Sequence, residues 1–175
     1  MNSCRTGFSR CWEGKMERVD KILCNQTYQE HLKKNLAAEA DRRFCRHNMA
    51  HFLDVARIAR ILCLEEHIKM NEEYLYAAAL LHDIGRHVQY ENGTPHEIAS
   101  ARIAPVILSE CGFSEEESIM ITEAILAHRD ISGAEGKDLK GILYRADKAS
   151  RPCFACTLQT ECHWESDKKN LTLRY

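Results

Sequence analysis

The chain has 175 residues, of which 26 are acidic and 24 are basic, and its formal net charge is −2. This balance excludes a polybasic nucleic-acid surface. The first residues hold no apolar run of signal-peptide length, and no later segment has roughly eighteen uncharged apolar residues, so we expect a cytoplasmic protein with neither a membrane nor a nucleic-acid partner. The nine cysteines are odd in number and scattered, so most should be reduced thiols.

Hydrophobic residues recur every three or four positions along most of the chain, which predicts an all-α protein. The expected organisation is an N-terminal segment at 1–43 with one or two helices, a helical domain at 44–150, and a cysteine-containing tail at 151–175 packed on that domain. The N-terminal helices are expected between residues 16 and 40, where a buried stripe is formed by Val19, Ile22, Leu23, Leu32 and Leu36.

Five further helices are expected in the central domain. A long one should begin near Phe44, and another should be stopped by Gly85. Ser114 followed by three glutamates is typical of a capped helix start. The expected ranges are 44–66, 71–83, 97–111, 115–128 and 138–150.

Six polar residues stand in sequence that otherwise indicates a buried core. Burying an imidazole or a carboxylate costs several kcal/mol unless it is paired or binds a metal. Each of the segments that carry these residues belongs to a different predicted helix or helix end, and bundled helices can direct such side chains to one point. Three or more imidazoles with carboxylates suit one or two divalent transition-metal ions. The six are His51, His82, Asp83, His96, His128 and Asp147.

The order of these residues resembles the HD-domain superfamily of metal-dependent phosphohydrolases. That family has an early histidine, a His-Asp doublet at a helix end and a late aspartate, here matched over roughly residues 46–150. The resemblance implies an HD-domain helical bundle in which His51, His82, Asp83 and Asp147 hold one ion. It also implies that Asp83 bridges to a second ion held by His96 and His128, with iron or manganese favoured over zinc.

Charged residues near the proposed ligands are candidates for a role in catalysis. Arg86 and Lys148 are expected to act beside His82 and Asp83 by stabilising negative charge on a phosphoryl group. Arg129 and Arg151 lie near the ligands too, although each of these cations also fits a solvated surface. His47 precedes His51 by four residues, so on a shared helix face it would orient a ligand or touch substrate.

The resemblance implies hydrolysis of a phosphoester or phosphoanhydride bond in a small molecule, plausibly a nucleotide. The branch that looks closest is that of the symmetrical diadenosine-tetraphosphate hydrolases. Two other functions fit the same residues. Mixed-valent di-iron oxygenases of this superfamily use a similar ligand set, and a metal- or nucleotide-responsive binding module would need no catalysis.

Three cysteines of the tail are spaced for a second metal. Cys153 and Cys156 form a C-x-x-C pair, and Cys162 follows six residues after Cys156. These thiols could converge on a structural zinc ion, with Cys45 or His163 as the fourth ligand. The alternative is that they are ordinary reduced thiols, and an iron–sulfur cluster is less favoured.

Overall fold

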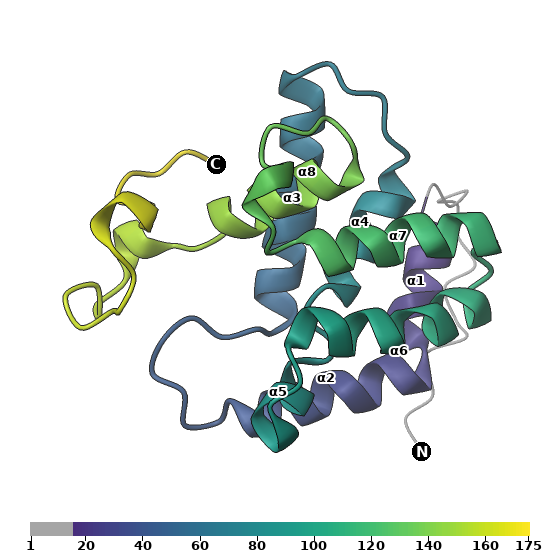
Figure 1. Ribbon diagram of the computed structural model, residues 1–175, viewed down its shortest axis with the longest axis horizontal. Helices are drawn as coiled ribbons and strands as arrows, with labels where there is room; N and C mark the ends of the chain where they lie inside the picture. The colour runs from purple at the N-terminus through teal and green to yellow at the C-terminus, as the bar shows by residue number, and fades with distance from the viewer. Residues whose placement is uncertain (1–15) are drawn as a thin grey trace, which may run out of the picture.

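The computed structural model describes residues 16–175, so residues 1–15 of the expected N-terminal segment lie outside the described part. Across residues 16–175 the chain forms helices and turns without a strand, which confirms the predicted all-α fold (Figure 1). The α-helices are α1 (Glu17–Cys24), α2 (Gln26–Ala38), α3 (Met49–Glu65), α4 (Glu72–Leu81), α5 (Arg86–Asn92), α6 (His96–Glu110), α7 (Glu115–Ala127) and α8 (Leu139–Ala149).

Helix α4 lies at the centre of the bundle. It contacts α1, α3, α6, α7 and α8, and six of its ten residues are buried. A helix that is apolar on every side must be surrounded by others. The C-terminal end of α4, where the His-Asp doublet follows, is therefore held deep in the protein.

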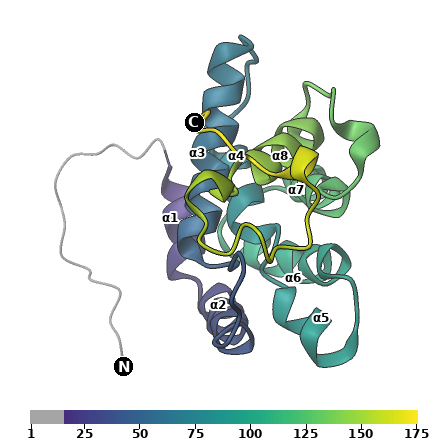
Figure 2. The same ribbon diagram turned by 90° about the vertical axis from the view of Figure 1, so that its left-hand side faces the viewer.

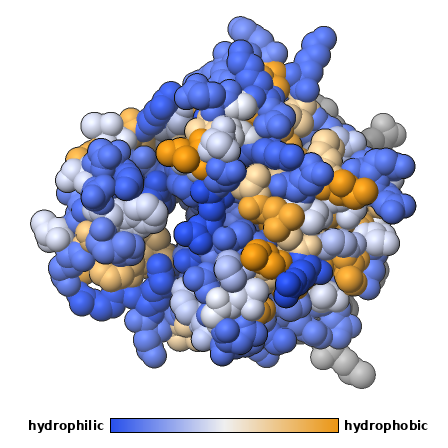
Figure 3. All heavy atoms as spheres, viewed as in Figure 1, coloured by the Kyte–Doolittle hydropathy of each residue, from blue (hydrophilic) through white to orange (hydrophobic). Residues whose placement is uncertain are grey.

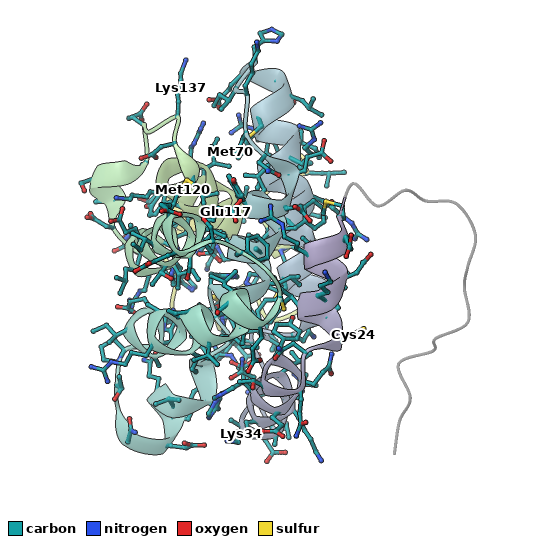
Figure 4. All side chains as sticks on the ribbon, turned by 90° about the vertical axis from the view of Figure 1, so that its right-hand side faces the viewer. Cys24, Lys34, Met70, Glu117, Met120 and Lys137 are labelled. Carbon is teal, nitrogen blue, oxygen red and sulfur yellow. The ribbon has the colours of Figure 1, made fainter. Side chains whose placement is uncertain are left out.

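The N-terminal helices are joined to this core by a charged network. Arg18 of α1 forms ion pairs with Glu73 of α4 at 2.7 Å and with Glu117 of α7 at 2.6 Å. The Tyr74 hydroxyl donates to Glu117 at 2.7 Å. Glu117 is labelled in Figure 4, which views the face of the bundle turned away from the C-terminal tail. Residues that precede the central domain thus pack as part of it.

Helix α3 begins later than the sequence pattern predicted. Its N-cap is Asn48, whose side chain accepts a hydrogen bond from the His51 backbone N–H at 3.2 Å. The segment from Phe44 to Asn48 is not helical. The prediction that His47 shares a helix face with His51 is therefore wrong, because the Asn48 cap makes Met49, two residues after His47, the first residue of the helix.

Helix α5 was not predicted. Gly85 does not end the helical region but is the N-cap of α5, and Gly93 ends α5 with a left-handed φ of 80°. A side chain at Gly85 would collide with α6, since a Cβ there would lie 2.5 Å from the Ser100 nitrogen and 2.8 Å from the Ala99 Cβ. The Gly85 N–H donates to the Ser100 hydroxyl at 2.9 Å. This close approach brings α6 against the doublet.

The last two helices of the bundle have strong caps. Ser114 and Glu117 form the predicted capping box of α7, and Asp138 accepts from the Gly141 N–H to start α8. Beyond α8, residues 151–175 run alongside the bundle as an irregular tail, drawn in yellow in Figure 1 and turned toward the viewer in Figure 2. In the described residues no helix is long and apolar enough to cross a membrane.

Candidate metal centre

The six residues singled out in the sequence come together in the structure. His51 comes from α3, His82 and Asp83 follow α4, His96 is the first residue of α6, His128 follows α7 and Asp147 lies in α8. Four of the six are at most 5% exposed, namely His82, Asp83, His96 and His128. Five helices or helix ends therefore direct polar groups into one buried volume.

One half of this cluster contains His51, His82, Asp83 and Asp147. His51 Nε2 lies 3.9 Å from Asp83 Oδ2 and 3.6 Å from Asp147 Oδ1. His82 Nε2 lies 3.4 Å and 3.8 Å from the same two oxygens. Such separations match the spacing of donor atoms that each lie about 2 Å from a shared ion.

The other half uses the second oxygen of the same carboxylate. Asp83 Oδ1 lies 3.1 Å from His96 Nε2 and 3.7 Å from His128 Nε2. The two Nε2 atoms are 3.3 Å apart. The donor atoms thus form two groups, and within each group they all lie within 4.8 Å of one another. One group is His51, His82 and Asp83, and the other is Asp83, His96 and His128. Asp83 is the residue that both groups share.

Hydrogen bonds on the far side of each ring fix how these imidazoles are protonated. His82 Nδ1 lies 2.8 Å from the Ala79 carbonyl oxygen, and His128 Nδ1 lies 2.6 Å from the Ile125 carbonyl oxygen. A carbonyl oxygen only accepts, so each Nδ1 must carry the proton. His96 Nδ1 likewise faces the Gln89 side-chain oxygen at 2.6 Å. Each Nε2 atom that faces Asp83 is then unprotonated and carries a free lone pair, which is the form that binds a metal.

Several of these inward-facing atoms have no hydrogen-bond partner. His51 Nε2, His82 Nε2 and Asp83 Oδ1 are buried and unpaired. An unpaired buried acceptor costs about 1–3 kcal/mol, and more if it is charged. Three such acceptors in one volume, beside the facing Nε2 atoms of His96 and His128, are groups that a bound cation would satisfy. The residues present therefore fit bound divalent metal ions.

The ionisation states agree with this donor set. Burial lowers the pKa of His51 to about 4 and the pKa of His96 to about 3, and it also lowers the pKa of His82. Burial alone would raise the pKa of Asp83, but the surrounding imidazoles hold it well below its usual range. Neutral imidazoles around an ionised carboxylate are what metal ligation needs near neutral pH.

His47 reaches the cluster from the loop before α3, held by a residue that sequence reasoning missed. Glu39 is 3% exposed and accepts from His47 Nδ1 at 2.6 Å and from the His47 backbone N–H at 2.7 Å. This directs His47 Nε2 toward Asp83 Oδ2 at 3.6 Å. Buried glutamates rarely occur without a partner, but Glu39 stands in a charged stretch of sequence that gave no such signal.

Asn35 is a second residue that the sequence did not reveal. Its side chain is fully buried, donates to the Asp83 carbonyl oxygen at 2.9 Å and accepts from the His87 N–H at 2.7 Å. Helix α2 therefore holds the backbone on both sides of the turn that carries the doublet. His87 is 3% exposed, and its Nε2 lies 2.8 Å from His31 Nδ1 of α2.

The cations predicted beside the ligands differ in position. Arg86 Nη1 lies 3.9 Å from Asp83 Oδ1 and 3.1 Å from His96 Nε2. Lys148 Nζ pairs with Asp147 Oδ2 at 2.6 Å, which leaves Asp147 Oδ1 facing the imidazoles. Arg129 is more than half exposed and pairs with Glu97. Arg86 and Lys148 thus contact candidate ligands, whereas Arg129 stands farther out.

A hollow of about 730 Å³ opens from the cluster to the surface. Its floor includes His51, Asp83 and His128, and the C-terminal tail forms its opposite wall. Figure 3 shows the opening between tail and bundle, bordered largely by hydrophilic side chains. The four cysteines singled out in the sequence and His163 also line this hollow. A small polar molecule could reach the cluster by this route.

Comparison with known proteins shows which family this chain resembles in sequence. The HD domain model matches residues 48–151. An uncharacterized protein of Clostridium beijerinckii is 47% identical over 160 residues, which cover 91% of this chain and 100% of that protein. Ribonuclease Y 1 of Pediococcus pentosaceus is 33% identical over 119 residues, which cover 65% of this chain but 20% of that protein. No solved structure matches. The HD match spans more than half of the chain, and the cluster described above lies within it, so this protein belongs to the HD-domain family.

Proposed function

We propose that this protein is a metal-dependent phosphohydrolase that acts on a small phosphorylated molecule of the nucleotide class. The observation that carries the proposal is the pair of ligand groups sharing Asp83, whose two oxygens face different sets of imidazole Nε2 atoms. HD domains bind divalent metals, and the donor set here suits two such ions, with iron or manganese preferred.

Divalent ions held in these groups would supply Lewis acidity and make a water molecule acidic enough to attack near neutral pH. The chain itself would hold and orient the reacting groups. Arg86 lies beside Asp83 and is 17% exposed, so its guanidinium can meet a phosphoryl oxygen at the floor of the hollow. Lys148 fixes the carboxylate of Asp147 and adds a second positive charge.

The lining and the size of the hollow support a phosphorylated small molecule as substrate. Cations predominate among its charged side chains and include Arg42, Arg43, Arg46, Arg86, Lys148 and Arg151. A basic lining attracts phosphorylated molecules. A volume of about 730 Å³ lies in the range of small-molecule and cofactor sites, roughly 300–1,000 Å³. These features support a mononucleotide or dinucleotide, including the diadenosine polyphosphates that the sequence resemblance suggested.

Two other activities would use the same cluster. An oxygenase needs iron and consumes oxygen, whereas a hydrolase releases phosphate or nucleotide without oxygen. The printed name of the Pediococcus relative says that it is a ribonuclease, and its match covers a fifth of that protein, so RNA is an alternative substrate. We favour the small molecule because the tail narrows the approach to the floor of the hollow.

The test uses full-length protein purified anaerobically and loaded with manganese or iron. Phosphate release would be followed with nucleoside mono-, di- and triphosphates and with diadenosine tetraphosphate, alongside single-stranded RNA and an oxygen-uptake assay. In Asp83→Asn both ligand groups lose their shared carboxylate, so metal content and turnover should fall together, turnover by about 10³-fold or more.

Asp20→Asn is the matched control, since Asp20 is exposed on α1, away from the cluster. It should leave metal content and turnover unchanged. Oxygen consumption without phosphate release would favour the oxygenase. Full metal content and turnover in Asp83→Asn would contradict the proposed site, and stable metal binding without turnover of any substrate would leave a binding module.

A further inference from the structure

The proposed hydrolase function gives no role to the cysteines of the tail. Cys45 lies in the loop between α2 and α3, while Cys153, Cys156 and Cys162 lie in the tail. These segments are far apart in the sequence, yet all four cysteines line the same hollow and all four are free. The fold has therefore gathered thiols from two segments on one side of the molecule.

The tail lacks an apolar core that could hold it in this place. None of the described residues from 151 to 175 is buried, and the buried hydrophobic cluster ends at Ala146. Phe154 and Trp164 are 44% and 39% exposed. By contrast, Cys153, Cys156 and Cys162 are each partly buried among mostly exposed neighbours. The tail thus turns its thiols inward and leaves Phe154 and Trp164 outside, while Tyr175 at its end packs partly buried against the bundle core.

Hydrogen bonds fix the backbone at these cysteines. The Cys156 N–H donates to the Cys153 carbonyl oxygen at 3.2 Å, which closes a tight turn over the C-x-x-C pair. The Gln159 side chain donates to the same carbonyl at 2.9 Å. Lys169 Nζ lies 2.9 Å from the Gln159 carbonyl oxygen and 3.4 Å from that of Cys162. These bonds shape the segment around its thiols, as in small metal-bound loops.

The loop that carries Cys45 is also joined to the tail directly. Arg43 pairs with Glu161 at 3.0 Å, next to Cys162. Cys45 is exposed, and the pKa of its thiol is raised by partial desolvation in the loop and by the thiols of Cys153, Cys156 and Cys162. The tail thiols therefore act on the charge of Cys45, and thiolates brought together would repel unless a cation lay between them.

We propose that Cys45, Cys153, Cys156 and Cys162 bind one structural zinc ion, which joins the tail to the loop before α3. Four thiolates suit tetrahedral Zn²⁺, which prefers sulfur ligands and needs no open coordination position when its role is structural. His163 is a poorer fourth ligand, because its ring is exposed, stacked on Trp164 and set edge-on to Phe44. The site is separate from the proposed catalytic centre.

Zinc binding also predicts a local movement. In residues 16–175, the groups of three or more donor atoms within 4.8 Å of one another are both in the bundle core. No three of the four sulfur atoms therefore lie within 4.8 Å of one another, and zinc binding would draw them together. Because the tail has no buried residue to resist it, this closure costs little and narrows the hollow from its outer side.

The test measures zinc in full-length protein carrying Asp83→Asn, so that the core ligands do not contribute. This background should retain about one zinc per chain. Cys153→Ser/Cys156→Ser should reduce that content at least tenfold, and Cys45→Ser should weaken zinc binding in competition with a chelator. Cobalt substitution should give intense thiolate-to-metal absorption that the double variant lacks. Circular dichroism would verify that the helices remain folded.

Cys111→Ala is the control, since Cys111 is a buried free thiol in the bundle. It should leave the zinc content of the Asp83→Asn background unchanged. Zinc content that persists in Cys153→Ser/Cys156→Ser, or pairing of these cysteines as disulfides in freshly prepared protein, would overturn the proposal. Loss of zinc in His163→Ala but not in Cys45→Ser would overturn the assignment of the fourth ligand.

Discussion

At the scale of single residues, the site depends on the hydrogen bond that each imidazole makes through Nδ1, the ring nitrogen that faces away from Asp83. The Nδ1 protons of His82 and His128 are bound to carbonyl oxygens one turn earlier in the chain, so the helix backbone fixes those tautomers. His96 and His47 depend instead on side chains, Gln89 and Glu39. Backbone acceptors cannot be removed by substitution, but side-chain acceptors can, which makes the second kind open to experiment.

Gln89→Met should weaken the metal group of His96 and His128 selectively. Methionine fills similar space but cannot accept strongly from His96 Nδ1, so the ring loses its fixed tautomer and orientation. Loss of such a partner typically lowers metal affinity about 10–100-fold. Metal titration against a chelator should show one weakened and one unchanged site. Gln26→Met, on the exposed face of α2, is the control, and equal weakening of both sites would contradict the assignment.

The buried imidazoles also predict how stability depends on pH. In the metal-free protein the pKa of His51 is about 4 and that of His96 about 3, both below the unfolded value near 6.5. At pH values between these folded and unfolded pKa values, the unfolded chain binds protons that the folded chain does not. Stability should therefore fall as pH drops below about 6.5, by up to about 1.4 kcal/mol per pH unit for each imidazole.

Urea unfolding of chelator-treated protein between about pH 7 and pH 5 would measure this slope. Metal-loaded protein should lose less stability over the same range, because bound ions hold the Nε2 lone pairs against protonation. A free energy of unfolding that stays constant down to pH 5 in the metal-free protein would show that these rings are not buried in their neutral form.

At the scale of helices, the turn between α4 and α5 sets the geometry of the site. Gly85→Ala should lower the free energy of unfolding by about 1–3 kcal/mol, since its Cβ would press into backbone atoms of α6 that cannot rotate away. Gly133→Ala is the control, because a Cβ there meets nothing within 4 Å. Equal stability of the two variants in urea unfolding would show that α6 does not need this close approach.

The helices and the six clustered residues could be predicted because their signals are local. Apolar periodicity marks a buried face, and capping residues such as Ser114 mark a start. The cap at Asn48 was missed because the apolar pattern continues upstream of it, and α5 was missed because Gly85 was interpreted only as a stop. Glu39 and Asn35 could not be predicted, since their partners are distant in sequence and known only once α2 is packed.

At the scale of the whole molecule, the chain divides into a bundle held by apolar packing and a tail held mainly by polar contacts, with Tyr175 packed against the bundle. The bundle contains every buried hydrophobic residue of the described part. The tail forms one wall of the hollow and is attached to the bundle at few points. One of these is Asn170, whose side-chain nitrogen lies within 3.1 Å of the carbonyl oxygens of Lys148, Ala149 and Arg151.

Asn170→Ala should therefore loosen the tail without unfolding the bundle. The substitution removes the Asn170 donor from the carbonyl oxygens of Lys148 and Ala149, the first of which keeps its bond from Arg151 Nε, and it breaks this link between the tail and the helix of Asp147. Trypsin should then cut after Lys168, Lys169 or Arg174 at least several-fold faster, because cleavage follows the population of locally opened chain. The melting temperature of the bundle should change little, since no buried apolar residue lies in the tail.

Limited proteolysis followed by mass spectrometry measures the cleavage rate, and far-ultraviolet circular dichroism follows the melting of the bundle. Asn92→Ala removes a comparable side-chain bond, to the Thr94 N–H, in a turn outside the tail, so it controls for the loss of an asparagine. Unchanged cleavage in Asn170→Ala would mean that other contacts hold the tail. A matching fall in the melting temperature would mean that tail and bundle unfold as one cooperative unit, because opening the tail would then open the bundle as well.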